Sequence, residues 1–381
     1  MNYSFNNINW PNFLFIASTT LAALIGVPWY IMTYGWGDSV IWSMAFFYYI
    51  ATGLSITLGY HRLFSHKSFS AKWPVKLGTL MFGAAAFENS AMSWAADHRR
   101  HHKHCDHDDD PYNALEGFFH SHVGWIIFKN SDPDYSYVRD LQKDKLVAWQ
   151  ERNYVLIGAL VGFAVPAFIG WSWNGMAGAL GGFFIAGVGR LVMVHHFTFL
   201  INSLCHTLGS QPYSNKSTAR DSAITALLTF GEGYHNFHHT FQHDYRNGVK
   251  FYHFDPTKWM ILLLSKIGLT GNLRRVPDEK IQQSRAKHQQ EKLDEKMSAR
   301  SIQLPVSVQD QLNAAKDKLE EAYRHWEELE AEYAKAMNRK IKESKDKIHE
   351  LQVEFAVAQE RFREAFDEWK RSHQLALTQF A

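Results

Sequence analysis

Cysteine is scarce in this sequence, with only Cys105 and Cys205 among 381 residues. Two thiols exclude a scaffold stapled by disulfides, and they are compatible with a reducing compartment. Net charge is low as well, because 40 Lys and Arg nearly balance 38 Asp and Glu. That balance gives no signal of nucleic-acid binding. The sequence also lacks a haem-attachment motif of the form CxxCH.

Charged residues are almost absent from four long apolar runs, in which Arg190 is the single exception. The runs cover residues 13–34, 40–60, 155–171 and 175–200. Each run is close to the roughly 20 residues that a helix needs to cross a bilayer. We therefore expect an all-α integral membrane protein with four transmembrane helices, capped by a cytosolic helical domain. Four buried helices of a soluble protein are the alternative.

Lys and Arg are missing from the two short loops between these runs, GWGDS and SWN, whereas residues 61–153 and the chain after 201 are rich in both. The positive-inside rule then places both termini and the 61–153 segment in the cytoplasm. Residues 75–94 are moderately apolar but contain Glu88 and Asn89. We expect a helix or hairpin there that is buried or interfacial, with a fifth span as the alternative.

The last hundred residues have a different composition, rich in Glu, Lys, Arg and Gln, and we expect a membrane domain over 1–277 and a cytosolic helical extension over 278–381. Two sets of apolar residues recur every seven positions: Leu312, Leu319, Trp326 and Tyr333, then Ile348, Phe355, Phe362 and Trp369. This heptad pattern predicts either a coiled coil that mediates self-association or a helical hairpin within one chain. Docking of an electron donor is a further role open to this extension.

Histidine is abundant, with 21 copies, and "DHRRHHKHCDHDDD" alone holds five within ten residues. On a helix, positions three and four apart share a face, so each HxxHH motif directs three imidazoles at one point. A gap of five, as in "HRLFSH", requires a helix end or a distortion. These three motifs supply eight candidate metal ligands: His61, His66, His98, His101, His102, His235, His238 and His239.

Eight imidazoles exceed what one ion needs and suit two first-row transition metals close together. A structural zinc site would use about four ligands, often cysteine. Neighbouring acids could accept the second ring N–H of each ligand, namely Asp97, Asp106, Asp108, Asp109, Asp110 and Glu232. We expect non-ligand roles for His104, His107, His120, His122, His195, His196 and His243.

Over residues 35–276 the sequence resembles the membrane-bound acyl-CoA Δ9 desaturases, the stearoyl-CoA desaturase family. The resemblance is carried by "GYHRLFSHKSF", "WAADHRRHHKHCDHDDDPYN", "GFFHSHVGWIIF", "NSLCHTLGSQPY" and "GEGYHNFHHTFQHDYRNG". It implies two iron ions held by nine histidines. The eight candidates are then joined by His206, which the spacing alone did not identify. Asn202 is implied to reach an iron through a water.

The resemblance also implies substrate contacts, at Trp94, Asp97, Glu88, Asn89 and Lys129. Two of these positions depart from the family pattern. Glu88 replaces a Gln found in some members, and Lys129–Asn130 replaces an Arg–Lys pair. The departure leaves acyl-CoA, acyl carrier protein and lipid esters open as forms of the substrate.

The activity implied is insertion of a cis double bond into a saturated acyl chain, with O2 as co-substrate. A separate protein, such as a ferredoxin or a reductase, is expected to deliver two electrons. That donor and the short N-terminus favour a bacterial inner membrane. The alternatives are a di-iron alkane or lipid hydroxylase and, more remotely, a metal transporter or sensor.

Overall fold

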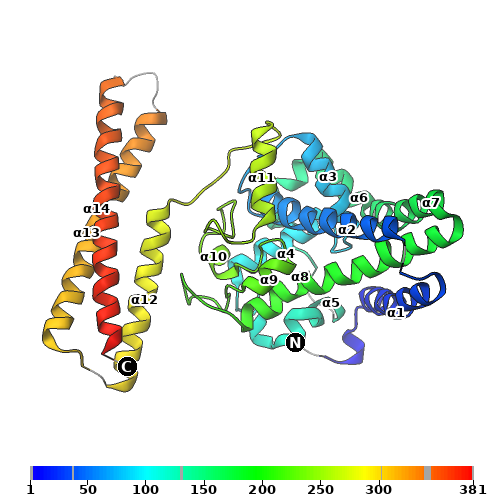
Figure 1. The fold of residues 1–381 in the computed structure, drawn as a ribbon, viewed down its shortest axis with the longest axis horizontal. Coiled ribbons are helices and arrows are strands. Elements are labelled where there is room, and N and C mark those ends of the chain that lie inside the picture. Colours follow the sequence, from blue (N-terminus) through cyan, green and yellow to red (C-terminus); the bar gives the residue numbers. More distant parts are fainter. Residues whose placement is uncertain (1–2, 37, 129–131, 302, 339–344, 380–381) are drawn as a thin grey trace. The chain divides into compact units, whose positions relative to one another are not determined.

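The chain is almost wholly helical and forms two compact units (Figure 1). This computed structural model describes residues 3–36, 38–128, 132–301, 303–338 and 345–379. The first unit comprises Met1–Gln211 and Asn215–Arg275, and the second comprises Pro212–Ser214 and Val276–Ala381. The main division therefore follows Arg275, where the sequence suggested residue 277.

Three helical stretches of the described chain are long and apolar enough to cross a membrane. The first is α1 (Trp10–Tyr34), and the second joins α2 (Ser39–Leu54) to the π-helical η2 (Ser55–Ser65). The third extends from Lys145 to Thr207. It consists of α6 (Lys145–Ala159), η7 (Leu160–Ala164), α7 (Val165–Gly181), η8 (Gly182–Gly189) and α8 (Arg190–Thr207).

The third stretch reverses direction within α7, at the predicted SWN loop. Asn174 and Gly175 have non-helical dihedral angles there, and Gly175 has φ +53°, which favours glycine. The two arms then pack so closely that a Cβ on Gly170 would clash with the carbonyl oxygen of Gly178. Glycine is required at this contact because it lets two helix backbones approach directly.

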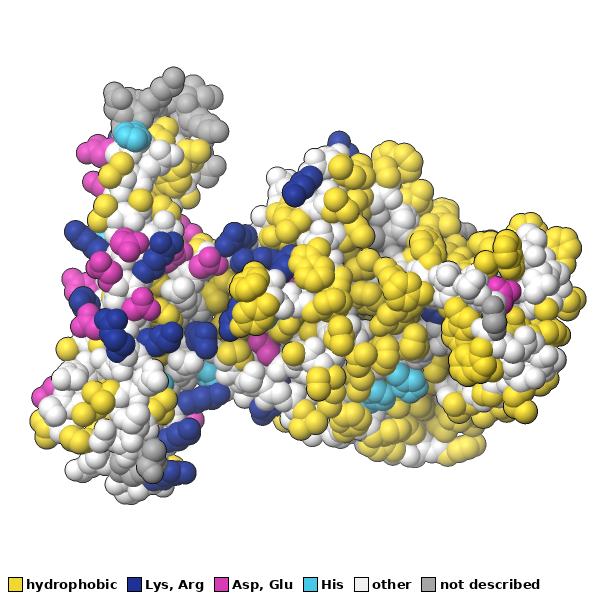
Figure 2. Space-filling view, viewed as in Figure 1, with side chains coloured by type: hydrophobic (Ala, Val, Ile, Leu, Met, Phe, Trp, Pro, Cys, Tyr) yellow, Lys and Arg dark blue, Asp and Glu magenta, His cyan; other side chains and the backbone are white. Residues whose placement is uncertain are grey.

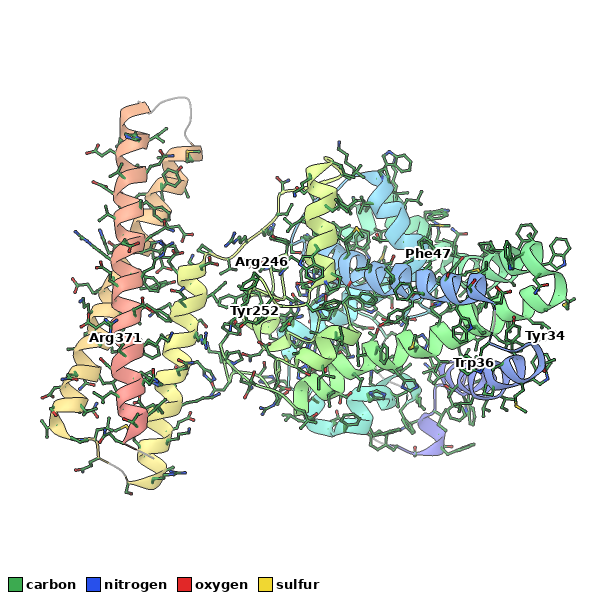
Figure 3. The ribbon with its side chains drawn as sticks, in the orientation of Figure 1. Tyr34, Trp36, Phe47, Arg246, Tyr252 and Arg371 are labelled. Atoms are coloured by element: carbon green, nitrogen blue, oxygen red, sulfur yellow. The ribbon has the colours of Figure 1, made fainter. Side chains whose placement is uncertain are left out.

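Aromatic side chains gather at the turns between the apolar helices. Tyr34 and Trp36 lie at the turn between α1 and α2 (Figure 3), and Trp36 stacks on Trp42 with ring centroids 5.6 Å apart. Trp171 and Trp173 are exposed next to the reversal in α7. Tyr and Trp favour membrane–water interfaces, where one end of the ring is wet. In Figure 2 the outer face of these helices is covered mainly by apolar side chains.

Arg190, the single charge in the four runs, is buried at 2% exposure. Its guanidinium donates to the carbonyl oxygens of Ala85 (2.8 Å), Gly162 (3.1 Å) and Ala186 (3.2 Å). Ala85 is the C-cap of α3 (Trp73–Ala84), whose last carbonyls have no partner within the helix. Arg190 thus supplies a hydrogen-bond donor to a carbonyl at the end of α3. Helix α3 itself is too short to be a candidate span.

After α3 the chain bends and then enters α4 (Ala91–His104). The 75–94 segment therefore contains most of α3, the bend, and the first residues of α4. Two strands of the first unit, β1 (Ser70–Ala71) and β2 (Thr270–Gly271), pair antiparallel. Its other helical segments are η1 (Phe5–Asn7), η3 (Ala114–Glu116), η4 (His120–Gly124), α5 (Trp125–Ile127), η5 (Tyr135–Val138), η6 (Leu141–Lys143), α9 (Ala223–Leu228), α10 (His235–Thr240) and α11 (Pro256–Lys266).

The described part of the second unit contains three helices, α12 (Asp278–Arg300), α13 (Val306–Asn338) and α14 (Lys345–Thr378). Figure 1 shows α13 and α14 side by side and antiparallel. The two heptad seams face each other in this hairpin. Trp326, Phe362 and Trp369 are at most 1% exposed, and the rings of Tyr333 and Phe355 stack 5.9 Å apart. Of the two arrangements that the heptads predicted, the structure therefore contains the hairpin within one chain.

Replacement of Trp369 by Ala is expected to destabilise this helical unit by about 3–5 kcal/mol, because it leaves a large cavity between α12, α13 and α14. Hydrogen exchange of the α13 and α14 amides in the full-length protein measures the effect. Val357→Ala on α14, where the side chain is 46% exposed, is the control and should change exchange little. Equal exchange in the two variants would contradict the packing described here.

Candidate metal centre

The second histidine motif lies on α4, whose start is fixed by side chains around it. The Ser90 hydroxyl caps the helix by accepting from Ser93 N (3.1 Å), and Ala91 N donates to the Gln150 side chain (3.0 Å). His98 and His102 then share one face of α4, and His101 lies on the adjoining face. The third motif lies on α10, where Asp221 caps the helix by accepting from Asn236 N and Phe237 N.

The first motif lies at the end of η2. The wide π-helical turns of η2 bring two histidines that are five residues apart onto nearly the same face. His66 N donates to His61 O (3.1 Å), a hydrogen bond between residues five apart. A π-helical turn accommodates nearly five residues, so positions i and i+5 come close to one face. The two rings consequently lie edge to face with centroids 4.7 Å apart.

The histidines form two groups, in each of which the candidate ligand atoms lie within 4.8 Å of one another. One group contains His61, His66, His98, His102 and His238. In it, the Nε2 atom of His238 lies 3.0 Å from that of His61 and 2.9 Å from that of His102. The Nε2 atoms of His66 and His98 are 2.9 Å apart. Five imidazoles therefore direct the same ring atom to one point.

The other group contains His101, His206, His235 and His239. The Nε2 atom of His235 lies 3.1 Å from those of His206 and His239, and His239 is 3.3 Å from His101. His206 comes from the end of α8, so residues of three helices, α4, α8 and α10, meet here. The nine histidines that the resemblance implied are thus brought together, five in one group and four in the other.

Burial favours the neutral form of six of these imidazoles, which is the form that binds metal. Loss of water contact lowers the pKa of His66, His98, His102, His235, His238 and His239 well below the usual value, and neighbouring imidazoles lower it further. Cys105 lies near His101 and His206, but burial and nearby carboxylates raise the pKa of its thiol. The thiol therefore stays protonated and is a poor ligand.

Several ligand rings are held at their second nitrogen. Asp110 lies 2.8 Å from His101 Nδ1, and the Tyr112 hydroxyl lies 3.1 Å from His98 Nδ1. Thr218 bridges His206 to Asp106 through its hydroxyl. Such partners fix the ring tautomer with Nε2 free for metal. Asp106, Asp110 and Glu232 were expected in this role, whereas Tyr112 and Thr218 were not, because hydroxyls are common at many positions.

A buried charge network supports His61. Glu232 Oε2 lies 2.7 Å from His61 Nδ1, and Glu232 Oε1 pairs with Arg62 (2.9 Å). Arg62 also pairs with Asp255 (3.0 Å) and donates to the Tyr245 carbonyl (2.8 Å). The guanidinium and His61 lower the pKa of Glu232 against the effect of burial, so its carboxylate stays charged. Sequence reasoning missed Arg62 and Asp255, although an arginine beside a ligand in "HRLFSH" was a signal.

A cavity of about 470 Å³ extends to the histidines. Its wall includes His61, His98 and His235, together with all but one of the implied substrate contacts: Glu88, Asn89, Trp94 and Asp97. Asn202 lines it as well. The Trp94 indole donates to Glu88 (3.4 Å), and burial raises the pKa of Glu88 to about 8. Lys129 lies outside the described residues.

The seven histidines expected to have other roles belong to neither group. His104 contacts the Tyr137 hydroxyl, His195 donates to the Ala86 carbonyl, and His243 contacts the His66 carbonyl. His122 and His196 contact each other (3.2 Å), and His107 contacts the Cys105 carbonyl. His120 is buried beside Tyr3.

Removal of one inward imidazole should lower metal content. We expect His98→Ala to reduce bound transition metal by at least one ion per chain, because His98 is central to the five-histidine group. Elemental analysis of anaerobically purified full-length protein measures this. His104→Ala, on the same helix, is the matched control and should retain the full content; equal metal in both variants would refute the assignment.

Glu232 provides a second test. Glu232→Gln removes the charge that faces His61 Nδ1 and leaves Arg62 with one carboxylate. Loss of such a partner typically weakens metal binding about 10–100-fold. Competition against a chelator measures the affinity, and Glu332→Gln, at an exposed position of α13, is the control. An affinity unchanged from that of the parent chain would mean that the network does not act on the metal.

Comparison with known proteins identifies the family. The family described as "Fatty acid desaturase" matches residues 39–264. A probable acyl-CoA desaturase of Schizosaccharomyces pombe is 43% identical over 291 residues, covering 76% of this chain and 59% of that protein. Acyl-CoA desaturase 1 of Saccharomyces cerevisiae is 38% identical over 302 residues, covering 78% and 58%. Human stearoyl-CoA desaturase is 34% identical over 278 residues, covering 70% and 74%.

The chain thus spans about three fifths of the length of the two fungal relatives. All the relatives named here are eukaryotic, and they give no support to the expected bacterial origin. The match of the family over residues 39–264 includes the nine histidines and the helices that present them. The chain belongs to the fatty acid desaturase family.

Proposed function

We propose that this protein is an acyl-CoA Δ9 desaturase that introduces a cis double bond into a saturated long-chain fatty acyl group. The observation that carries the proposal is the cavity, because one continuous space is lined by apolar side chains and by histidines of both groups. The relatives named as acyl-CoA and stearoyl-CoA desaturases support the substrate class. The double-bond position follows the resemblance to the Δ9 enzymes.

The donor set fits two iron ions. Nine imidazoles in groups of five and four, with adjacent Nε2 atoms 2.9–3.3 Å apart, suit first-row metals and exceed the four ligands of a structural zinc site. The chemistry that such a centre supplies is the O2-dependent oxidation of adjacent unactivated CH2 groups. No side-chain acid or base removes those hydrogens near neutral pH.

The protein's own residues would bind and orient the acyl chain. Trp94 stacks on His98 with centroids 4.7 Å apart, so the indole face forms the wall beside the metal centre. Phe199, Phe230 and Val194 add apolar surface to the cavity. An apolar wall excludes bulk water, which protects an oxidising centre from side reactions. Asn202, which also lines the cavity, is the proposed water-mediated ligand.

We further propose four membrane crossings, in which the reversal at Asn174–Gly175 divides the third apolar stretch into two. The positive-inside pattern then supports a cytoplasmic metal centre and cytoplasmic termini. Electrons would come from a separate donor such as a ferredoxin or a reductase. The proposal of a bacterial inner membrane rests only on the expectation of a separate electron donor. The heptad seams of α13 and α14 pack against each other within one chain, and self-association through these helices stays a prediction.

Expression in a host that lacks Δ9 desaturation is expected to yield monounsaturated chains, which gas chromatography of the fatty acids detects. His235→Ala should abolish them while His104→Ala retains them. The prediction requires oxygen, so anaerobic cultures should give only saturated chains. Hydroxylated products instead would identify a hydroxylase, and an unchanged profile with altered cellular metal would point to metal transport; both outcomes contradict the proposal.

A further inference from the structure

The loop before α11 exposes several aromatic side chains. Phe251 is 92% exposed and Tyr252 is 63% exposed, and Tyr252 can be located on this loop in Figure 3. Phe254 and Trp259 are exposed as well, and their rings pack edge to face with centroids 5.5 Å apart. Exposed apolar side chains that cluster in this way indicate a contact with another molecule. Residues 250–254 are called the aromatic loop below.

The charge at the surface of the aromatic loop is positive. Lys250 is the single exposed charged side chain among residues 244–259, all of which the structure describes. Its ammonium group lies over the Tyr252 ring, 5.4 Å from the centroid. The two acids of this stretch, Asp244 and Asp255, are buried and paired with arginines. A partner with an acidic surface is therefore electrostatically complementary to this loop.

A stack of rings connects the aromatic loop to the candidate metal centre. The Tyr252 ring packs edge to face on His253 with centroids 5.2 Å apart. The His253 ring lies flat on the Tyr234 ring, with centroids 4.2 Å apart and an interplanar angle of 8°. Tyr234 directly precedes His235, which belongs to the four-histidine group. One peptide bond therefore separates the stack from a candidate ligand.

Backbone packing holds the stack in place. A Cβ on Gly248 would lie 2.8 Å from the Cβ of His253 and 3.1 Å from the Tyr234 ring, so a side chain at this position would push the rings away. Burial, followed by the charges of Lys250 and Lys258, lowers the pKa of His253 to about 4. The ring is therefore neutral near pH 7, and it lies in a positive local potential.

We propose that the aromatic loop is the docking surface of an acidic one-electron carrier protein, whose electrons pass through His253 and Tyr234 to the metal centre. A few aromatic side chains beside one cation suit the small interfaces of transient redox complexes. The rings are in contact along the whole path, which favours electron transfer because its rate falls steeply with the gap between groups.

This inference rests on the proposed function, because desaturation consumes electrons. O2, two protons, two electrons and one CH2–CH2 unit give one CH=CH unit and two waters. Each encounter oxidises one carrier by one electron and reduces the metal centre by one electron, so two encounters supply one turnover.

Ferredoxin, a small acidic one-electron carrier, is the probe for docking to the full-length, metal-loaded protein. Lys250→Glu should weaken binding of oxidised ferredoxin about five-fold or more at low salt and less at high salt, because salt screens surface charges. Phe251→Ala should weaken it about ten-fold, since an aromatic anchor is lost. Isothermal titration calorimetry measures both affinities.

Lys72 and Trp73 provide the matched controls, because they are an exposed lysine and an exposed aromatic side chain at the start of α3. Lys72→Glu and Trp73→Ala should each change the affinity by less than about two-fold, the effect of a screened surface group. Equal weakening by loop and control variants, or no weakening by the loop variants, would overturn the docking surface. Loss of self-association in Phe251→Ala with unchanged ferredoxin affinity would assign the loop to a second copy and would also overturn it.

His253→Leu tests the path through the rings. Ferredoxin should bind this variant as it binds the parent protein, because the exposed side chains are unchanged. Oxidation of reduced ferredoxin, followed anaerobically by stopped-flow absorbance, should slow about ten-fold, because the missing ring leaves a gap in the contacts. His253→Phe keeps a ring in the stack and should restore most of the rate. Reduction by dithionite should be equal in all variants. An unchanged ferredoxin rate in His253→Leu would refute the path.

Failure of the docking surface is distinguishable from failure of the proposed function. A parent protein that binds ferredoxin and takes up its electrons but forms no unsaturated chains would refute the proposed function alone. A parent protein that forms unsaturated chains without binding ferredoxin, or that binds it no more tightly than Lys250→Glu and Phe251→Ala do, would refute the docking surface alone.

Discussion

The convergence of nine imidazoles, seven of them buried, is the constraint on which the first unit depends. Desolvated ring nitrogens 2.9–3.3 Å apart cannot all be satisfied by one another, because a neutral imidazole has one donor and one acceptor. Two metal ions would resolve that conflict, because each would accept an electron pair from the rings around it. The fold accordingly brings η2, α4, α8 and α10 to one place and attaches carboxylates or hydroxyls to several outward nitrogens.

The surrounding structure balances buried charge with directed partners. Glu232 stands between His61 and Arg62, and Asp255 completes the pairing of the guanidinium. Breaking such a buried network typically costs several kcal/mol, since it leaves one charge uncompensated. Arg190 is stabilised differently, by backbone carbonyls that take the place of a carboxylate. The contacts of Arg62 and Arg190 thus connect segments that also contribute side chains to the cavity wall.

Much of this organisation could be predicted from the sequence because hydropathy and helical spacing are local. Long uncharged runs indicated the apolar helices, and the HxxHH motif on α4 identified three ligand candidates. The prediction that one HxxHH motif directs its three imidazoles at one point was wrong, because His98 and His102 join one group and His101 joins the other. The distortion needed for His61 and His66 was foreseen, although its π-helical form was not. His206 followed from resemblance alone, since a single histidine has no spacing. The cavity, Arg62–Asp255 and Thr218 depend on contacts between distant segments, and no local pattern encodes them. The heptads left two arrangements open because one seam can pair within a chain or between chains.

Iron K-edge X-ray absorption of the anaerobically purified protein tests the central claim most directly, that two irons are held by histidine side chains without a cysteine ligand. The account predicts two irons per chain with nitrogen and oxygen scatterers and strong imidazole multiple scattering, from five histidines at one iron and four at the other. A sulfur shell would show that Cys105 binds the metal. One iron or fewer per chain in active protein would likewise contradict the account.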